Sequence, residues 1–209
     1  MKLEIKNVEK KFNSNYVLNN INLTMENGKI YGFVGRNGSG KTVLLKLICG
    51  FYKPTDGEIL LDGYNYIKNN EYPKNTGALI ENPSFLPYLS GYDNLKLLAD
   101  INNQIKKEDI DNILKLVNLY DDRNKIVFKY SLGMKQKLGI AQAIMENQDL
   151  IVLDEPFNGV EKESASKIRD YLKTIKENKI IIISTHVSED LDNFVDVVYK
   201  IEDGRIVNE

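Results

Sequence analysis

The sequence predicts an α/β fold with a mainly parallel sheet as its core, an antiparallel β-subdomain at the N-terminus and a helical insert. Residues 150–153 and 180–183 are almost unbroken apolar runs, as in strands that are buried on both faces of a parallel sheet. Residues 3–8 and 17–25 instead alternate apolar and polar side chains, which is typical of half-exposed antiparallel strands. Between these halves the apolar residues recur at helical spacing.

The first half of the chain predicts a strand, a loop and a helix in close succession. Residues 30–34 form a short apolar run that ends in a glycine-rich loop. A helix is expected from about residue 41 to residue 49, where Gly50 and a turn at residues 54–57 end it. Residues 78–80 then predict another strand, which leads into the insert.

The helical insert is expected from about residue 82 to residue 148. Residues 92–117 and 132–145 both have helical spacing, and so does the segment 160–175 that follows the first buried apolar run. Near the C-terminus, Asp203-Gly204 lies between two short apolar segments, which predicts a hairpin.

Composition excludes several classes of protein. The 209 residues suffice for one substantial domain, and 42% hydrophobic with 28% charged residues is typical of a globular protein. The net charge of −2 gives no attraction to a phosphate backbone, so we expect no nucleic acid partner. The single cysteine, Cys49, cannot form an internal disulfide, which suits the cytoplasm. No apolar run approaches the roughly 20 residues that span a bilayer, so a membrane role requires a partner.

A phosphate-binding motif follows the strand at residues 30–34. Residues 35–42 read G-R-N-G-S-G-K-T and fit G-x-x-x-x-G-K-[ST], the phosphate loop of P-loop NTPases. Glycines let successive backbone N–H groups point at a polyphosphate, and the helix N-terminus favours its negative charge. Lys41 is expected to reach the β- and γ-phosphates of ATP, and the Thr42 hydroxyl to bind Mg²⁺. The predicted binding residues are Gly35, Asn37, Gly38, Ser39, Gly40, Lys41 and Thr42. The alternative is a chance glycine-rich turn.

A second acidic site is predicted at the end of the run 150–153. Asp154 and Glu155 follow it directly, at the sheet edge where ligands bind in open α/β folds. Because adjacent strand residues point to opposite sides, the two carboxylates should differ in role. Asp154 is expected to hold Mg²⁺, and Glu155 to orient or deprotonate the attacking water. A solvated turn is the alternative.

His186 is the only histidine, and it lies just beyond the run 180–183. A lone histidine is more often structural than catalytic. Here it should emerge at the same sheet edge as Lys41 and Asp154, where it can contact the γ-phosphate or position the water.

With these pieces placed, nearly the whole chain resembles the nucleotide-binding subunit of an ABC transporter. Residues 130–134, Y-S-L-G-M, stand a short helix before the acidic strand, where that family carries its LSGGQ-type signature. Ser131 is also a favourable N-cap for the helix that starts near Leu132. The resemblance implies that Ser131 and the Gly133 amide bind the γ-phosphate of ATP held by the opposite subunit of a dimer. An ordinary capped helix is the alternative.

Other elements of the family are placed by position. Phe12 stands where the family carries an aromatic ring that stacks on adenine, with Tyr16 as the alternative and a plain surface aromatic as a third reading. Glu81 occupies the position of the Q-loop glutamine, from which its carboxylate would approach Mg²⁺ or water. Residues 158–161 match the D-loop, with Glu161 where aspartate is usual.

The signature departs from the family pattern at Leu132 and Met134, which replace a glycine-like residue and the final glutamine. Together, residues 80–83 and 130–134 are similar to the bacitracin-resistance and lantibiotic-immunity branch of exporter ATPases. We interpret the departures as a mark of this branch, because the residues of the ATP site are retained.

The resemblance implies one ABC ATPase domain over residues 1–209, with a RecA-like core and β-subdomain at 1–81 and 149–209 and a helical subdomain at 82–148. It implies an ATPase that powers transport, with export of an antimicrobial peptide, drug or lipid-like substrate expected. The expected partners are a separate transmembrane permease and a second ATPase subunit, in a homodimer or heterodimer. The chain would then be cytoplasmic and peripheral on the inner face of the membrane. A non-transport ABC ATPase and a regulatory or immunity module with little turnover are the alternatives.

Overall fold

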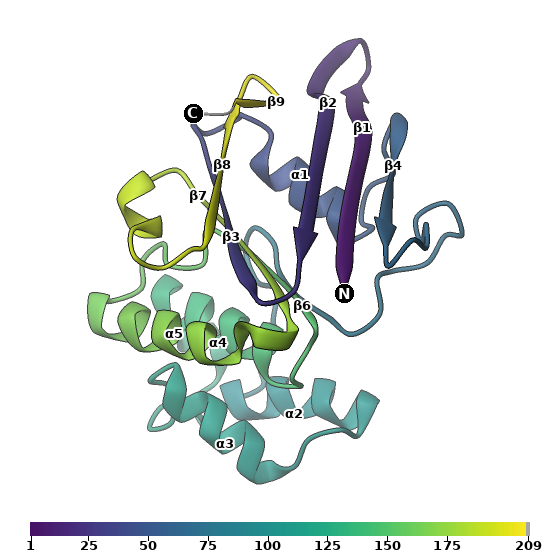
Figure 1. Ribbon diagram of the computed structural model, residues 1–209. Coiled ribbons are helices and arrows are strands. Elements are labelled where there is room, and N and C mark those ends of the chain that lie inside the picture. The colour runs from purple at the N-terminus through teal and green to yellow at the C-terminus, as the bar shows by residue number, and fades with distance from the viewer. Residues whose placement is uncertain (208–209) are drawn as a thin grey trace.

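Two β-sheets make up the framework of the protein, whose computed structural model describes residues 1–207 (Figure 1). The smaller sheet has the strand order β2-β1-β4, and the larger sheet has the order β5-β6-β7-β3-β8-β9. The strands have the following bounds: β1 Lys2–Phe12, β2 Asn15–Glu26, β3 Lys29–Val34, β4 Asp56–Leu61, β5 Thr76–Leu79, β6 Leu150–Asp154, β7 Ile180–Thr185, β8 Val197–Glu202 and β9 Arg205–Val207.

The smaller sheet is the predicted antiparallel β-subdomain. β1 pairs antiparallel with β2 on one side and with β4 on the other. Leu3 and Ile5 face inward in alternation, and a register shift after Ile5 turns Val8 inward as well, so that all three are buried. The sequence analysis missed β4, because its first three residues are exposed and only Ile59 and Leu60 are buried.

The larger sheet is parallel from β5 to β8, and β9 adds an antiparallel edge strand through the predicted C-terminal hairpin. Every residue of β6 and β7 is buried. Alternate side chains of these strands enter two different clusters: Ile151 and Ile181 face one side of the sheet, whereas Val152 and Ile182 face the other. Both faces therefore need apolar side chains, which explains the unbroken runs and confirms the predicted α/β fold.

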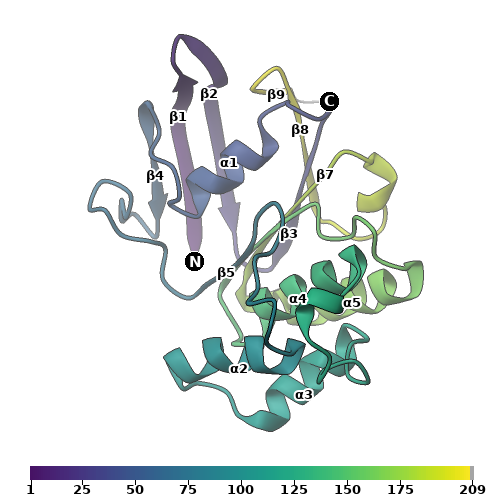
Figure 2. The ribbon, with the colours of Figure 1, turned by 180° about the vertical axis from the view of Figure 1, so that it is seen from behind.

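Helix α1 (Lys41–Ile48) packs between the smaller sheet and the larger one, as the view from behind shows (Figure 2). Its apolar residues Leu44, Leu45, Leu47 and Ile48 are fully buried in one cluster with residues of β1, β2, β6 and β7. This packing fixes the helix that follows the phosphate loop against both sheets.

The remaining α-helices lie on the other side of the larger sheet. They are α2 (Gly91–Asn102), α3 (Lys107–Leu116), α4 (Leu132–Ile144) and α5 (Lys162–Ile175). Among them, α4 contacts β5 and β6, and α3 packs against α2, α4 and α5. The spacing over residues 92–117 is divided between two helices, because Asn103 ends α2 in a left-handed conformation with φ of 56°. Asp109 then accepts a hydrogen bond from the Lys106 N–H and begins α3.

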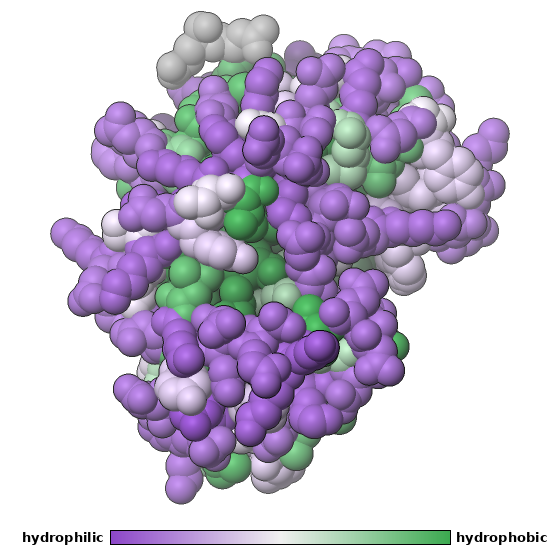
Figure 3. All heavy atoms as spheres, turned by 60° about the horizontal axis from the view of Figure 1, so that its bottom comes forward, coloured by the Kyte–Doolittle hydropathy of each residue, from purple (hydrophilic) through white to green (hydrophobic). Residues whose placement is uncertain are grey.

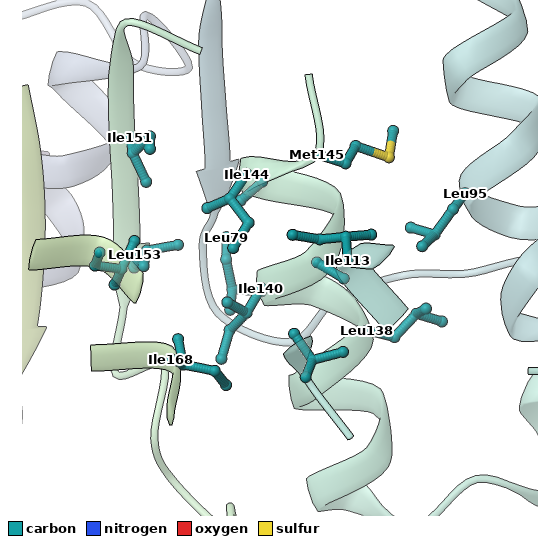
Figure 4. Close-up of a cluster of buried hydrophobic side chains, with 14 of the residues drawn as sticks. Leu79, Leu95, Ile113, Leu138, Ile140, Ile144, Met145, Ile151, Leu153 and Ile168 are labelled. Carbon is teal, nitrogen blue, oxygen red and sulfur yellow. The ribbon is translucent and has the colours of Figure 1, made fainter. Parts of the chain in front are cut away.

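The insert shares a core with the larger sheet. Figure 4 shows α4 between β5 and α2, with Ile140 and Ile144 directed toward Leu79 of β5, and with Leu138 nearer to Leu95 of α2. All of these side chains belong to one buried cluster that also contains residues of α3, α5, β6 and β7. The position of α4 relative to the end of β6 is therefore fixed by packing.

The outer surface is largely hydrophilic. On the face turned forward in Figure 3, most of the side chains are hydrophilic, and hydrophobic ones gather in a central hollow. Within residues 1–207, no helix combines the length and the apolar character that crossing a membrane requires.

We predict that Cys49, at the end of α1, resists alkylation in the folded protein. Its side chain is 3% exposed, and burial raises the pKa of the thiol to about 12, so little reactive thiolate is present. Iodoacetamide at pH 8 should label the native protein about 100-fold more slowly than the urea-unfolded protein. Mass spectrometry measures both rates, and equal labelling in the two states would show that α1 is not packed as described.

Candidate functional site

The carboxyl ends of three parallel strands meet at one edge of the larger sheet. β3 and β6 both pair in parallel with β7, and Asp154 lies opposite Ser184 in the register. The phosphate loop follows β3, Glu155 follows β6, and His186 follows β7. The structure therefore brings together residues that the sequence analysis selected from three separate segments.

The phosphate loop is closed by Gly40 and Lys41. Gly40 has φ of 107°, and a Cβ there would lie 2.9 Å from the carbonyl oxygen of Val17. Only glycine combines that backbone conformation with such close packing. The Lys41 ammonium donates hydrogen bonds to the carbonyl oxygens of Gly35, at 2.7 Å, and Arg36, at 3.1 Å. Lys41 thus crosses the loop and holds its curvature.

The loop borders a cleft that fits a polyphosphate. A hollow of about 520 Å³ is lined by residues 35–39, by His186, and by the end of β8 with the first residue of the following turn, residues 200–203. Ser39 lines it and is 7% exposed, and among the described residues its hydroxyl oxygen has no hydrogen-bond partner. A buried hydroxyl without a partner is costly unless a ligand satisfies it. Phosphate oxygens at this loop would do so, and ATP therefore fits the residues present.

Thr42 and Asp154 form the other wall of the site. The Thr42 hydroxyl donates to one carboxylate oxygen of Asp154 at 2.8 Å, and the Ser184 hydroxyl donates to the other. The Ser184 oxygen also accepts the N–H of Glu155 at 3.0 Å. One serine at the end of β7 therefore fixes both acidic residues, a role that the sequence analysis did not assign. The sequence signal that could have identified Ser184 is a hydroxyl side chain directly after the apolar run 180–183, at the same sheet edge as the acid pair.

Glu155 lies beyond the end of β6, in a left-handed conformation with φ of 45°. One carboxylate oxygen lies 3.8 Å from the Lys41 ammonium, and the other lies 2.9 Å from Nδ1 of His186 and accepts from the Asn158 amide. The carboxylates of Asp154 and Glu155 do contact different side chains. This difference arises from the left-handed turn at Glu155. The prediction had attributed it to the alternation of side chains along a strand, but β6 ends at Asp154.

Burial and charge act in opposite directions on Lys41. Its side chain is 5% exposed, and this burial lowers the pKa of the ammonium below its usual value. The carboxylates of Glu155 and Asp154 partly offset that effect by favouring the charged form. A bound polyphosphate adds negative charge at the same place and would further favour the ammonium.

The predicted metal ligands fit Mg²⁺ only in part. Among residues 1–207 there is no group of three His, Cys, Asp or Glu side chains arranged to hold a metal. Mg²⁺ is commonly bound by one or two carboxylates together with phosphate oxygens, and Thr42 with Asp154 suits that mode. Thr42, Asp154 and Glu81 line a second cleft, of about 340 Å³. The Glu81 carboxylate pairs there with the Lys46 ammonium at 2.6 Å.

The helix that follows the signature segment begins beside the loop after Glu155. The Ser131 hydroxyl accepts the Met134 N–H at 3.2 Å, which confirms the predicted N-cap. Gly133 packs so closely that a Cβ there would lie 2.2 Å from the carbonyl oxygen of Gly159. The Gln136 amide, which is buried, donates to the carbonyl oxygen of Glu155 at 3.0 Å. These contacts tie α4 to the loop that carries Glu155.

Both candidate adenine-stacking residues are exposed, at 41% for Phe12 and 49% for Tyr16. The Phe12 ring packs edge-on against Tyr52, with centroids 5.6 Å apart, and the Lys10 ammonium lies 5.0 Å from its centroid. The Lys11 ammonium lies 4.1 Å from the Tyr16 centroid. The choice between the two rings remains a prediction.

Comparison with known families identifies the fold and the activity. Residues 18–158, which include the phosphate loop, the signature segment and the acid pair, match the family described as "ABC transporter". The chain belongs to the ABC transporter family. It is therefore an ATP-binding subunit and an ATPase, and its phosphate loop and acid pair lie within the matched residues.

Curated relatives cover almost the full chain. It is 40% identical to the bacitracin transport ATP-binding protein BcrA of Enterococcus faecalis, over 99% of this chain and 68% of the relative. It is 32% identical to the lantibiotic transport ATP-binding protein SrtF of Streptococcus pyogenes, over 99% of this chain and 90% of the relative. The solved structure of an ATP binding subunit of an ABC transporter shares the fold with a TM-score of 0.88, at 24% identity over 99% of this chain and 88% of that one.

We predict that Ser184→Ala lowers the free energy of unfolding by about 1–3 kcal/mol, because a buried carboxylate of Asp154 and the Glu155 N–H both lose a partner. Ser188→Ala is the matched control. Ser188 is exposed, and its replacement should change stability by less than about 0.5 kcal/mol. Urea unfolding followed by circular dichroism measures both, and equal stability of the two variants would contradict the role given to Ser184.

Proposed function

We propose that the chain powers transport through ATP-driven closure of a dimer that is coupled to a separate transmembrane permease. The observation that carries the proposal is the convergence of Lys41, Asp154, Glu155 and His186 at one sheet edge. In this proposal residues 1–81 and 149–209 form the RecA-like core with the β-subdomain, and residues 82–148 form the helical subdomain.

Within the site, the phosphate loop binds the ATP phosphates through its N–H groups and Lys41, and Phe12 stacks on the base. Thr42 and Asp154 would hold Mg²⁺, with Glu81 at the rim of the same cleft. Mg²⁺ held there would neutralise negative charge on the phosphate oxygens. Glu155 accepts a proton from the attacking water or orients it, while His186 holds the Glu155 carboxylate in place.

The signature segment supports closure onto a second subunit. Ser131 is exposed at the N-terminus of α4, where backbone N–H groups and the helix dipole favour an anion. In a head-to-tail homodimer or heterodimer, Ser131 and Gly133 would contact the γ-phosphate of ATP on the facing subunit. ATP then bridges two chains, and hydrolysis removes that bridge.

The segment at residues 82–90 supplies the contact with the permease. Tyr88 is 84% exposed and Leu86 is 55% exposed, so both present apolar surface. Phe85 is instead partly buried and packs against the hydrophobic core, which anchors the segment that carries Tyr88 and Leu86. An amphipathic helix of the permease would bury Tyr88 and Leu86 and hold the chain at the inner face of the membrane.

The names of the relatives suggest the cargo. One relative is described as a bacitracin transport protein and another as a lantibiotic transport protein. We therefore infer export of an antimicrobial peptide, drug or lipid-like substrate. The intact Glu155–His186 contact favours an active ATPase over an ATP-binding module with little turnover.

The dimer is tested by sedimentation of Glu155→Gln with and without ATP and Mg²⁺. We expect a monomer without nucleotide and a dimer with it, because the variant keeps the binding residues and loses the group that activates water. Lys41→Ala in the Glu155→Gln background is the matched control and should stay monomeric. A persistent monomer at saturating ATP would contradict closure of two identical chains.

A further inference from the structure

The ion pair between Glu81 and Lys46 stands at the rim of the ATP site. Their carboxylate oxygen and ammonium nitrogen are 2.6 Å apart, a short charge-assisted hydrogen bond. Glu81 follows β5 and has φ of 57°, so a turn directs it away from the strand. Its side chain is 58% exposed, whereas that of Lys46 is only 17% exposed. The lysine is therefore the better-fixed partner.

Helix α1 places Lys46 close to the proposed magnesium ligand. Thr42 and Lys46 are four residues apart on α1 and so lie one turn apart on the same face. Thr42 bonds to Asp154 from that face, and Thr42, Asp154 and Glu81 line one cleft. Lys46 thus anchors Glu81 to the helix that carries the phosphate-binding residues.

An aromatic residue holds Lys46 from another side. The Lys46 ammonium lies 5.4 Å from the ring centroid of Tyr52, within the range of a cation–π contact. Tyr52 in turn packs edge-on against Phe12. With Tyr52 on one side and Glu81 on the other, the ammonium has a fixed position at the rim.

The charges around Thr42 explain why the pairing of Lys46 with Glu81 matters. Three carboxylates, those of Glu81, Asp154 and Glu155, border the cleft. Lys41 lies 3.8 Å from Glu155, and Lys46 pairs with Glu81. An unpaired Glu81 would repel the ATP phosphates and would attract Mg²⁺ away from Asp154.

We propose that Lys46 is a positioning residue for Glu81, whose carboxylate it neutralises and holds at the rim of the cleft. The position then adds no net negative charge beside the ATP phosphates. Glutamine is the usual residue at this position in the ABC transporter family, as the resemblance implies, and the ion pair supplies the same net charge with two side chains. This inference rests on the proposed ATP site and concerns how Glu81 is tolerated in it.

The test is a double-mutant cycle on ATP affinity, measured by isothermal titration at about 0.15 M salt in EDTA and again with Mg²⁺. Lys46→Met should weaken Mg²⁺-free ATP binding about three- to tenfold, because the Glu81 charge is no longer compensated. Glu81→Gln should bind ATP at least as tightly as wild type, and Lys46→Met should change the affinity by less than about twofold in the Glu81→Gln background, because the carboxylate that Lys46 holds is then absent. Lys46→Met should also reach half-maximal Mg²⁺ stimulation of binding at a lower Mg²⁺ concentration.

Lys96→Met is the matched control, because Lys96 pairs with Asp100 on the exposed surface of α2, away from the cleft. It should leave ATP affinity unchanged in both buffers. Melting temperatures check the fold of each variant, and Lys46→Gln replaces Lys46→Met throughout if the latter does not fold. Equal ATP affinities of Lys46→Met and wild type, or a loss of the same size on Lys46→Met in the Glu81→Gln background, would overturn the inference. Failure of wild type to bind ATP would instead contradict the proposed function.

Discussion

Burial of β6 and β7 on both faces is the constraint on which the site depends. Because alternate residues of each strand enter different cores, neither strand can slip by one residue without placing its side chains in the wrong cluster. The register that pairs Asp154 with Ser184 is therefore fixed from both sides. That pairing fixes where Asp154 lies relative to Thr42, and hence relative to the phosphate loop that leads into α1.

The local patterns were sufficient to predict the α/β fold. They also predicted that the phosphate loop, the acid pair and His186 lie at one sheet edge, since each of the three directly follows a buried strand. They were insufficient where the structure depends on contacts between distant segments. The roles of Ser184 and Gln136 arise from bonds to residues 154 and 155. The left-handed turn at Glu155 and the Lys46–Glu81 pair likewise have no signature in the sequence around them.

Helix α4 connects two features that would act on different ATP molecules in the proposed dimer. Its first turn carries Ser131 and Gly133, and its buried Gln136 donates to the backbone of Glu155. The close approach of Gly133 to Gly159 leaves no room for a side chain between them. A displacement of the signature segment must therefore displace the loop that carries Glu155. The packing that stabilises the domain thus also couples the signature segment to the acidic site.

The most direct test of the account is steady-state ATP hydrolysis by wild type and Glu155→Gln, with ATP affinity measured on the same samples. The account predicts that hydrolysis falls by about 10²- to 10⁴-fold while ATP affinity stays within a few-fold of wild type, because Glu155 acts on water and Lys41 on the phosphates. Hydrolysis by Glu155→Gln at the wild-type rate would contradict the assignment of Glu155, and with it the proposed use of this sheet edge.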